Sequence, residues 1–179
     1  MPVAHQNTAT RTPLFSRHQP GGTYAYAPIR RFPGEVFFVG SASTNAVDDT
    51  GHGRSPEAPF ATLDYAIGQT TANQGDVIYL MPGHVELVTA AANLDLDTAG
   101  IHIIGCGNGT LQPIIRFTTV DTADMDVDAA NITIEKVHFQ AGFANVVAAI
   151  DVNATDFTIR NCRFTEQGAN LNARNNNEG

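Results

Sequence analysis

The sequence predicts an all-β protein built as a short parallel β-helix, and three observations support this prediction. First, the segment "DMDVDAANITIEKVHF" (residues 124–139) returns in pattern 25 residues later as "AIDVNATDFTIRNCRF" (residues 149–164). Second, apolar and polar residues alternate with a period of two in both segments, which is typical of strands with one buried face. Third, no helical pattern lies between these strands, whereas parallel strands outside a solenoid need long crossovers, usually helices.

A turn residue precedes each short strand of the repeat. Gly75 and Asp76 lead "VIYL", Gly100 leads "IHII", Asn131 leads "ITIE" and Asp156 leads "FTIR". The spacing between Gly100 and Asn131 is longer than the others, and the excess lies at "GCGNGTLQP", which we interpret as an insertion into one coil. Coils of this size can stack about 4.8 Å apart and bury together an apolar face that none of them buries alone. An antiparallel sandwich also explains the alternation, but not the matching columns at a fixed offset.

The region before the repeat contains two further strands and one helix. "EVFFVG" (residues 35–40) is a strand rich in Val and Phe, followed by a long polar loop. "ATLDYAIGQT" places Leu63, Ala66 and Ile67 on one helical face, with an N-cap near Thr62. "GDVIYLMPG" is a strand that ends at a Pro-Gly turn.

The segment "FFVGSASTNAVDDTGHGRSPEAPFATLDYAIGQTTANQGDVIYLMPGHVE" resembles the N-terminal entry of pectin-lyase-like right-handed parallel β-helix proteins. The resemblance extends over roughly residues 35–167 and implies a right-handed, single-stranded β-helix with an N-terminal capping helix. It does not specify an activity, because that superfamily includes polysaccharide lyases and hydrolases, bacterial surface proteins, and phage tailspikes and other virion proteins. We therefore expect three regions: an extended basic arm (1–34), an entry strand, loop and capping helix (35–74), and β-helix coils without a C-terminal capping pattern (75–179).

Charge is distributed unevenly along the chain. The formal net charge is −8, yet the arm holds four arginines and no acidic residue, so the remainder carries −12. We interpret Arg11, Arg17, Arg30 and Arg31 as candidate partner-binding residues of an anchoring arm, against the alternative of a flexible tail. The acidic body argues against a nucleic-acid partner. No apolar run is long enough to span a bilayer, and the N-terminus has no apolar signal region.

Aspartates recur on the polar side of the repeat. Asp95, Asp126 and Asp151 form one predicted column, and Asp97, Asp128 and Asn153 form another. Clustered carboxylates are the ligands that Ca²⁺ prefers, so the five aspartates are weak candidates for a calcium site. The alternative, which we favour, is a solvated polar face with screened charges and no cofactor.

Catalytic groups do not cluster in the sequence. No Asp pair lies beside a His or Arg with the spacing of the family's lyases or hydrolases. The histidines have no metal-binding spacing, and we expect His84 in a loop and His138 on an outward column. Cys106 and Cys162 are expected to face inward, too far apart for a disulfide. Glu135 and Arg160 share a column and are expected to pair across adjacent coils.

These features favour a non-enzymatic structural protein of a virus particle: a capsid decoration protein, a head fibre or a tailspike-like module. Its expected partners are other virion or capsid subunits, with a host surface glycan as a further candidate, and we expect a homo-oligomer, a trimer among the options. The alternative is a carbohydrate-binding or carbohydrate-cleaving β-helix protein at the cell surface or outside the cell.

Overall fold

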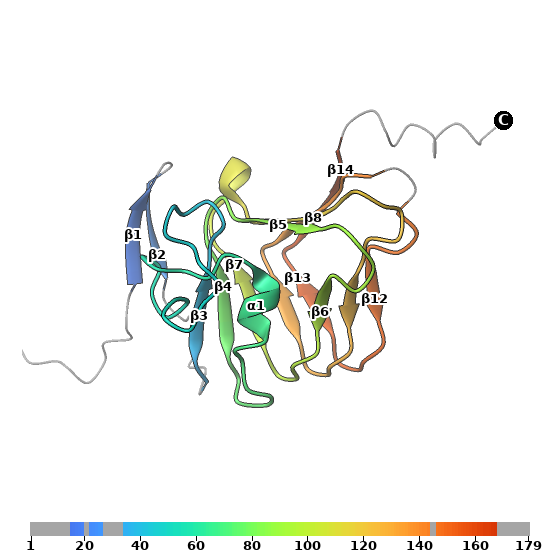
Figure 1. Cartoon of the computed structure of the whole chain (residues 1–179), viewed down its shortest axis with the longest axis horizontal. Coiled ribbons are helices and arrows are strands. Elements are labelled where there is room, and N and C mark those ends of the chain that lie inside the picture. Colours follow the sequence, from blue (N-terminus) through green and yellow to red (C-terminus); the bar gives the residue numbers. More distant parts are fainter. Residues whose placement is uncertain (1–14, 20–21, 27–33, 144–145, 168–179) are drawn as a thin grey trace, which may run out of the picture.

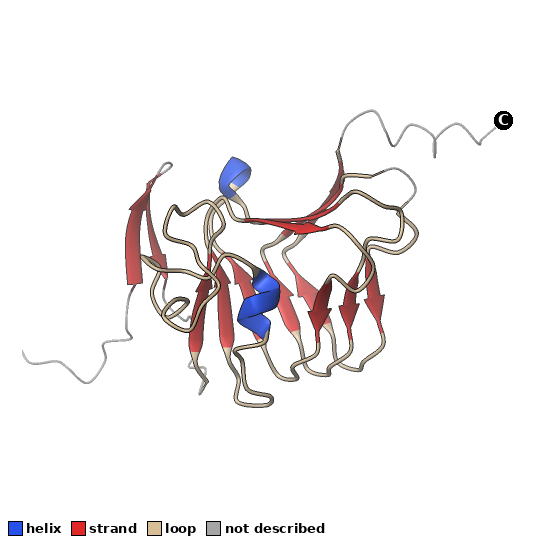
Figure 2. Cartoon of the chain, viewed as in Figure 1, coloured by secondary structure: helices blue, strands red, loops and turns tan. Residues whose placement is uncertain are grey.

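The computed structural model describes residues 15–19, 22–26, 34–143 and 146–167. These residues are mostly strands in parallel sheets, with very little helix (Figure 2). The predicted all-β class with parallel strands is confirmed. No helix in the described ranges has the length and apolar character needed to cross a membrane.

Three parallel sheets make up the body of the protein. The first contains β3 (Val36–Val39), β4 (Val77–Leu80), β7 (His102–Gly105), β10 (Thr133–Glu135) and β13 (Thr158–Arg160). The second contains β5 (Val85–Val88), β8 (Ile114–Phe117), β11 (His138–Ala141) and β14 (Arg163–Glu166). The third contains β6 (Leu94–Leu96), β9 (Met125–Val127) and β12 (Ile150–Val152). From β4 onward, successive strands belong to different sheets, so the chain passes through all three in turn (Figure 1). We call one such passage a coil: β6–β8, β9–β11 and β12–β14 are three stacked coils.

The register between the last two coils is the one that the repeat predicts. Met125 pairs with Ile150, Ile134 with Ile159, and Phe139 with Phe164, each at an offset of 25 residues. Since side chains alternate across a strand, this register keeps every apolar column on the inner side of the stack.

The predicted turn residues adopt the left-handed conformation that a sharp corner requires. The φ angles are 75° at Gly75, 78° at Gly100, 61° at Asn131 and 59° at Asp156. Glycine, asparagine and aspartate are the residues that enter this region at least cost. The repeated turn residues therefore specify one corner of each coil.

The interior of the stack is a continuous apolar core. The fully buried members contributed by β9–β11 and the turns between them are Met125, Val127, Ile132, Ile134, Val137 and Phe139, each at most 2% exposed. The inward positions of successive coils thus form one core, as expected for coils that cannot bury their faces alone.

The predicted helix lies at the start of the body. Helix α1 (Leu63–Ile67) has Thr62 as its N-cap, whose hydroxyl accepts a hydrogen bond from the Tyr65 N–H at 3.3 Å. The helix packs against β3, β4 and β6 and contributes Leu63, Ala66 and Ile67 to the core. A short 3-10 helix, Gly109–Leu111, lies in the inserted loop "GCGNGTLQP".

A second apolar cluster lies on the outward side of the first sheet. Phe38, Val77, Tyr79 and Met81 are at most 4% exposed and form this cluster, although the alternate residues of β3 and β4 already fill the core. The rings of Phe38 and Tyr79 stack with their centroids 5.8 Å apart. Burial raises the pKa of the Tyr79 hydroxyl to about 12.

The prediction for Cys106 is wrong in its direction. Cys106 packs against the outward cluster, whereas Cys162 packs against the core. The reason is that both faces of the first sheet are apolar at this end, so an apolar residue directly after β7 does not have to face inward. Both cysteines are free, and burial raises the pKa of the Cys106 thiol to about 12.

The described part of the predicted arm forms a hairpin that the sequence did not predict. β1 (Phe15–Gln19) pairs antiparallel with β2 (Gly22–Tyr26), and Figure 1 places this hairpin at the β3 end of the coil stack. Arg17 belongs to β1, whereas Arg11, Arg30 and Arg31 lie outside the described residues.

Candidate functional site

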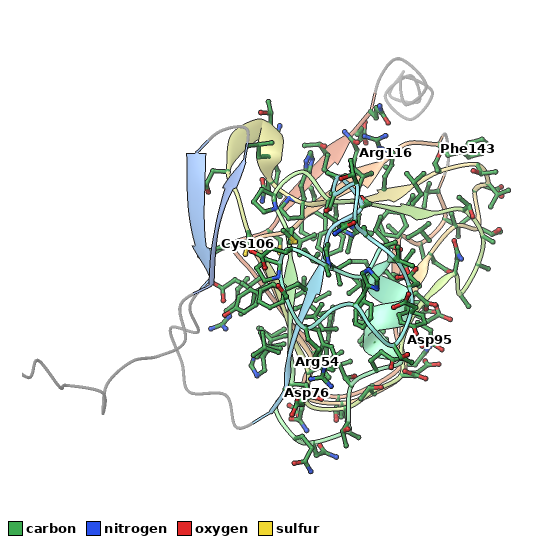
Figure 3. All side chains as sticks on the ribbon, turned by 60° about the vertical axis from the view of Figure 1, so that its left-hand side comes forward. Arg54, Asp76, Asp95, Cys106, Arg116 and Phe143 are labelled. Atoms are coloured by element: carbon green, nitrogen blue, oxygen red, sulfur yellow. The ribbon has the colours of Figure 1, made fainter. Side chains whose placement is uncertain are left out.

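The third sheet brings the predicted aspartate column together. Asp95 pairs in register with Asp126, and Asp126 with Asp151, while the flanking Leu94 and Met125 are buried. The three carboxylates therefore point outward from neighbouring strands. In Figure 3, Asp95 lies on a different side of the coil stack from Cys106.

Mutual repulsion makes this column electrostatically unfavourable. Partial burial and, after it, the neighbouring Asp97, Asp128 and Asp126 carboxylates raise the pKa of Asp95 above its ordinary value. Partial burial, followed by Asp124, Asp128 and Asp151, likewise raises the pKa of Asp126. Two carboxylate charges at the spacing of adjacent strands repel each other by about 0.9 kcal/mol in water.

In the column of Asp97 and Asp128, an asparagine takes the place of the third aspartate and relieves this repulsion. Asn153 stands where the earlier coils have Asp97 and Asp128, and its amide donates a hydrogen bond to Asp128 Oδ1 at 3.0 Å. In the ranges that the structure describes, no three His, Cys, Asp or Glu side chains come together in a way that could hold a metal ion. The aspartate columns therefore line up as predicted but do not converge on one point.

We expect Asp126→Asn to stabilise the protein by about 0.5–1 kcal/mol at pH 7, after allowance for solvent screening. The substitution removes the middle charge of the column and supplies an amide that can donate to its neighbours, as Asn153 does. The folded-state pKa of Asp126 is raised, so the folded protein binds this proton more tightly than the unfolded chain. The protonated carboxyl is thus stabilising below its ordinary pKa of about 4, and this stability is lost as the pH rises through the folded-state value.

The gain from Asp126→Asn should therefore disappear near pH 3, and urea unfolding followed by circular dichroism at the two pH values measures it. Asp121→Asn is the matched control, because Asp121 is exposed and lies outside the columns. A gain at pH 7 that is equal for both variants would show that net charge, not the column, is responsible.

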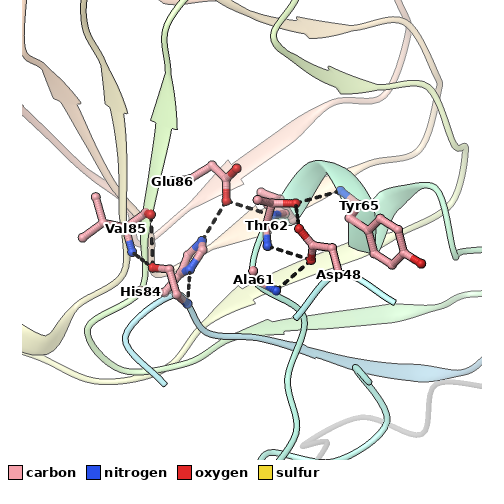
Figure 4. Close-up of polar contacts among 9 residues, drawn as sticks. Asp48, Ala61, Thr62, Tyr65, His84, Val85 and Glu86 are labelled. Atoms are coloured by element: carbon pink, nitrogen blue, oxygen red, sulfur yellow. Dashed lines mark hydrogen bonds and ion pairs between the residues drawn. The ribbon is translucent and has the colours of Figure 1, made fainter. Parts of the chain in front are cut away.

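A buried polar network lies beneath helix α1 (Figure 4). Glu86 faces the interior from β5, and its Oε2 accepts the Leu63 N–H at 2.8 Å. His84 is fully buried, with Nε2 3.0 Å from the same oxygen and Nδ1 accepting the Ser41 N–H at 3.1 Å. Because Nδ1 is the acceptor of this hydrogen bond, the ring carries its proton on Nε2, the nitrogen that faces Glu86. His84 lies in a loop, as predicted, but it is not at the surface, because its ring connects the loop after β3 to Glu86 below the helix N-terminus.

The loop before helix α1 is fixed by a second carboxylate. Asp48 accepts the N–H groups of Ala61 at 2.7 Å and Thr62 at 3.1 Å, and also the Thr62 hydroxyl at 2.9 Å (Figure 4). The first N–H groups of a helix have no partner within it. Here Asp48 accepts that of the N-cap Thr62, Glu86 accepts that of Leu63, and the Thr62 hydroxyl accepts that of Tyr65.

A third carboxylate joins the start of two strands. Asp76 is 1% exposed, and its two oxygens accept the N–H groups of Glu35 and Thr71, each at 2.7 Å. A Cβ atom at Gly34 would collide with this carboxylate, which explains the glycine there. Asp76 therefore holds the entry to β3, the segment after α1 and the start of β4 together.

The predicted cross-coil ion pair is present. Arg160 Nη2 lies 3.5 Å from Glu135 Oε2, with both side chains partly exposed, so the pair contributes little to stability. Arg54 pairs with Glu35 and lies 4.3 Å from the centroid of the Phe37 ring. These arginines serve contacts within the fold.

The remaining histidines make local contacts. His52 Nδ1 lies 2.6 Å from Asp49 Oδ1, and this hydrogen bond lowers the pKa of the exposed Asp49 carboxyl. His138 contacts the Thr165 hydroxyl at 2.5 Å; it is 8% exposed, and burial together with Arg163 and Arg116 lowers its pKa. His138 was expected on an outward column, and it is outward but buried. No nucleophile, base and oxyanion donor come together among the residues described above.

Comparison with known proteins adds no relative to this picture: no protein-family model, curated protein or solved structure matches the chain.

Proposed function

We propose that this chain is a non-enzymatic structural protein of a virus particle, attached through its basic N-terminal arm (residues 1–34). Capsid decoration, a head fibre and a tailspike-like module are the roles that fit such a protein. Its location would be the virion, and its partners other virion or capsid subunits, with copies of the chain itself in an oligomer such as a trimer.

The observation that carries this proposal is the use made of the buried ionisable groups. Asp76 and Glu86 accept backbone N–H groups, and so does the His84 ring through Nδ1. Catalytic carboxylates and histidines need an open side towards a substrate, whereas these groups are buried and bind backbone N–H groups of the fold. A fold whose buried ionisable groups bind its own backbone N–H groups suits a structural role.

We propose a right-handed, single-stranded parallel β-helix of the pectin-lyase-like kind, with α1 as the cap of its first coil. The outer edge of β3 supports this view, because Phe38 donates to the Gly53 carbonyl at 2.8 Å and accepts from Phe60 N at 2.9 Å. The loop before α1 thus closes this end of the stack, as a cap must.

Charge asymmetry supports the role of the arm. The first 34 residues carry +4 and the rest −12, so the arm is attracted to an acidic partner surface that repels the body. The same asymmetry gives the arm an orienting role, with the acidic coils directed away from the surface to which it binds.

We expect replacement of Arg11, Arg17, Arg30 and Arg31 by Glu in the full chain to lower the particle-bound fraction about tenfold or more, since four ion pairs at about 0.5 kcal/mol each would be lost. Particles from a culture that makes the protein are purified on a density gradient, and the bound copies are counted by quantitative mass spectrometry. The same four positions replaced by Gln are the control, with an intermediate loss that shrinks at high salt.

Two results would contradict the proposal. One is particle association that survives charge reversal of all four arginines. The other is cleavage of an acidic polysaccharide by the purified chain with Ca²⁺ present, which would favour the alternative of a carbohydrate-cleaving β-helix enzyme.

A further inference from the structure

The outward face of the second sheet is basic, although the chain after residue 34 carries −12. Glu86 and Glu166 occupy inward positions, so no outward position of β5, β8, β11 or β14 carries an acidic residue. Arg116, His138 and Arg163 occupy outward positions on the three neighbouring strands β8, β11 and β14. This face therefore has the opposite charge from the outward face of the third sheet.

The two arginines of this face form no ion pair with a carboxylate in the part of the chain that the structure describes. Arg116 Nε donates to the Gln140 side chain at 2.8 Å, and Arg163 is exposed. Burial, followed by Arg163 and Arg116, lowers the pKa of His138. Arg116 and Arg163 are therefore the permanent charges of this face, because a guanidinium stays protonated at any ordinary pH.

Three successive coils each carry one aspartate on the third sheet and one basic residue on the second. The three sets are Asp95 with Arg116, Asp126 with His138, and Asp151 with Arg163. Both columns follow the stacking of the coils and so repeat about every 4.8 Å. In one chain the columns belong to different sheets, and Figure 3 shows Arg116 and Asp95 at separate places on the stack.

We propose that the outward face of the second sheet binds the aspartate column of the third sheet in a neighbouring copy of this chain. If the stacks lie side by side about a common axis parallel to them, the coils of all copies are level. Each arginine can then reach an aspartate in the neighbour's corresponding coil or in the next, since coils are only about 4.8 Å apart. The two surfaces differ, so the contact is heterologous and closes into a ring, of which a trimer is one example.

The contact relieves a repulsion that a single chain retains. Partial burial and then neighbouring carboxylates raise the pKa values of Asp95 and Asp126, so this column is unfavourable in one copy alone. A guanidinium from a neighbour supplies the opposite charge and can bind a carboxylate through two hydrogen bonds. An acidic glycan on the basic face would leave the aspartate column as it is, whereas a second copy satisfies both columns with one contact.

Sedimentation equilibrium of the full chain over about 1–100 µM at low ionic strength tests the proposal, and we expect a closed oligomer. Arg163→Glu and Asp151→Lys, both at exposed positions of the same coil, should each raise the dissociation constant at least about tenfold, because like charges would then face each other. Glu57→Lys is the matched control: it makes the same charge change as Asp151→Lys in the exposed loop before α1 and should leave the oligomer intact. Far-ultraviolet circular dichroism checks that each variant is folded.

The double variant Arg163→Glu/Asp151→Lys tests whether the two positions face each other. It should restore association, because every contact in the ring then joins opposite charges again. A monomer at about 100 µM, an oligomer that both single variants leave unchanged, or a double variant as weak as the single ones would overturn the proposal. A monomer that binds alginate through Arg163 would overturn it too and would assign the basic face to an acidic glycan.

This inference specifies the oligomer named in the proposed function, but its test uses the chain alone, without virus particles. Failure of the ring would leave attachment through the arm as it stands. Loss of particle attachment would likewise leave the ring in place, because the contact uses residues of the coils only.

Discussion

Asp76→Ala is expected to destabilise the protein by about 2–4 kcal/mol, because the Glu35 and Thr71 N–H groups would lose their acceptors at once. The carboxylate is 1% exposed, so water has little access to replace it. Urea unfolding followed by far-ultraviolet circular dichroism measures the loss, since the chain has no Trp for fluorescence.

Two further variants show whether the carboxylate itself is responsible. Asp76→Asn keeps one oxygen acceptor and should lose about half as much, whereas Asp97→Ala removes an exposed carboxylate that bonds the neighbouring Thr98 hydroxyl and should cost under about 0.5 kcal/mol. Equal losses for Asp76→Ala and Asp97→Ala would show that Asp76 does not hold the two strand starts together.

The repeat was enough to predict which residues pair. The 25-residue offset specified the register of Ile134 with Ile159, and the turn letters at Asn131 and Asp156 specified where the chain bends. Both features arise from constraints within or between adjacent coils, namely side-chain alternation and the low cost of positive φ at these residue types. The aspartate column at Asp126 follows from the same register.

The carboxylate network could not be predicted in the same way. Glu86 occupies an inward position of β5, and alternation alone would place an apolar residue there. Its role depends on the N-terminus of α1 lying over that position, a contact that joins residues 23 positions apart. The one local signal for this network was the presence of a charged residue at an inward position, because a buried charge needs a dedicated partner.

The sequence contains a signal for the outward cluster that our prediction did not use. "VIYL" and "VFFV" are apolar at every position, and all four residues of β4 are buried. A continuous apolar run indicates a strand buried on both faces, whereas the alternating strands further along have one polar face. Cys106 was placed inward because one-sided burial was assumed for the whole sheet.

Ile134→Ala is expected to cost about 3–4 kcal/mol, since Ile134 is fully buried and the cavity would be closed in by the coils on either side. Ile159→Ala, one coil later in the same column, should cost only about 1–2 kcal/mol, because Ile159 is partly exposed. Urea unfolding of both variants, followed by far-ultraviolet circular dichroism, gives the two values.

The comparison tests whether burial decreases along this column from β10 to β13. Equal costs for the two variants would mean that Ile159 is enclosed as completely as Ile134, and would contradict the expected order.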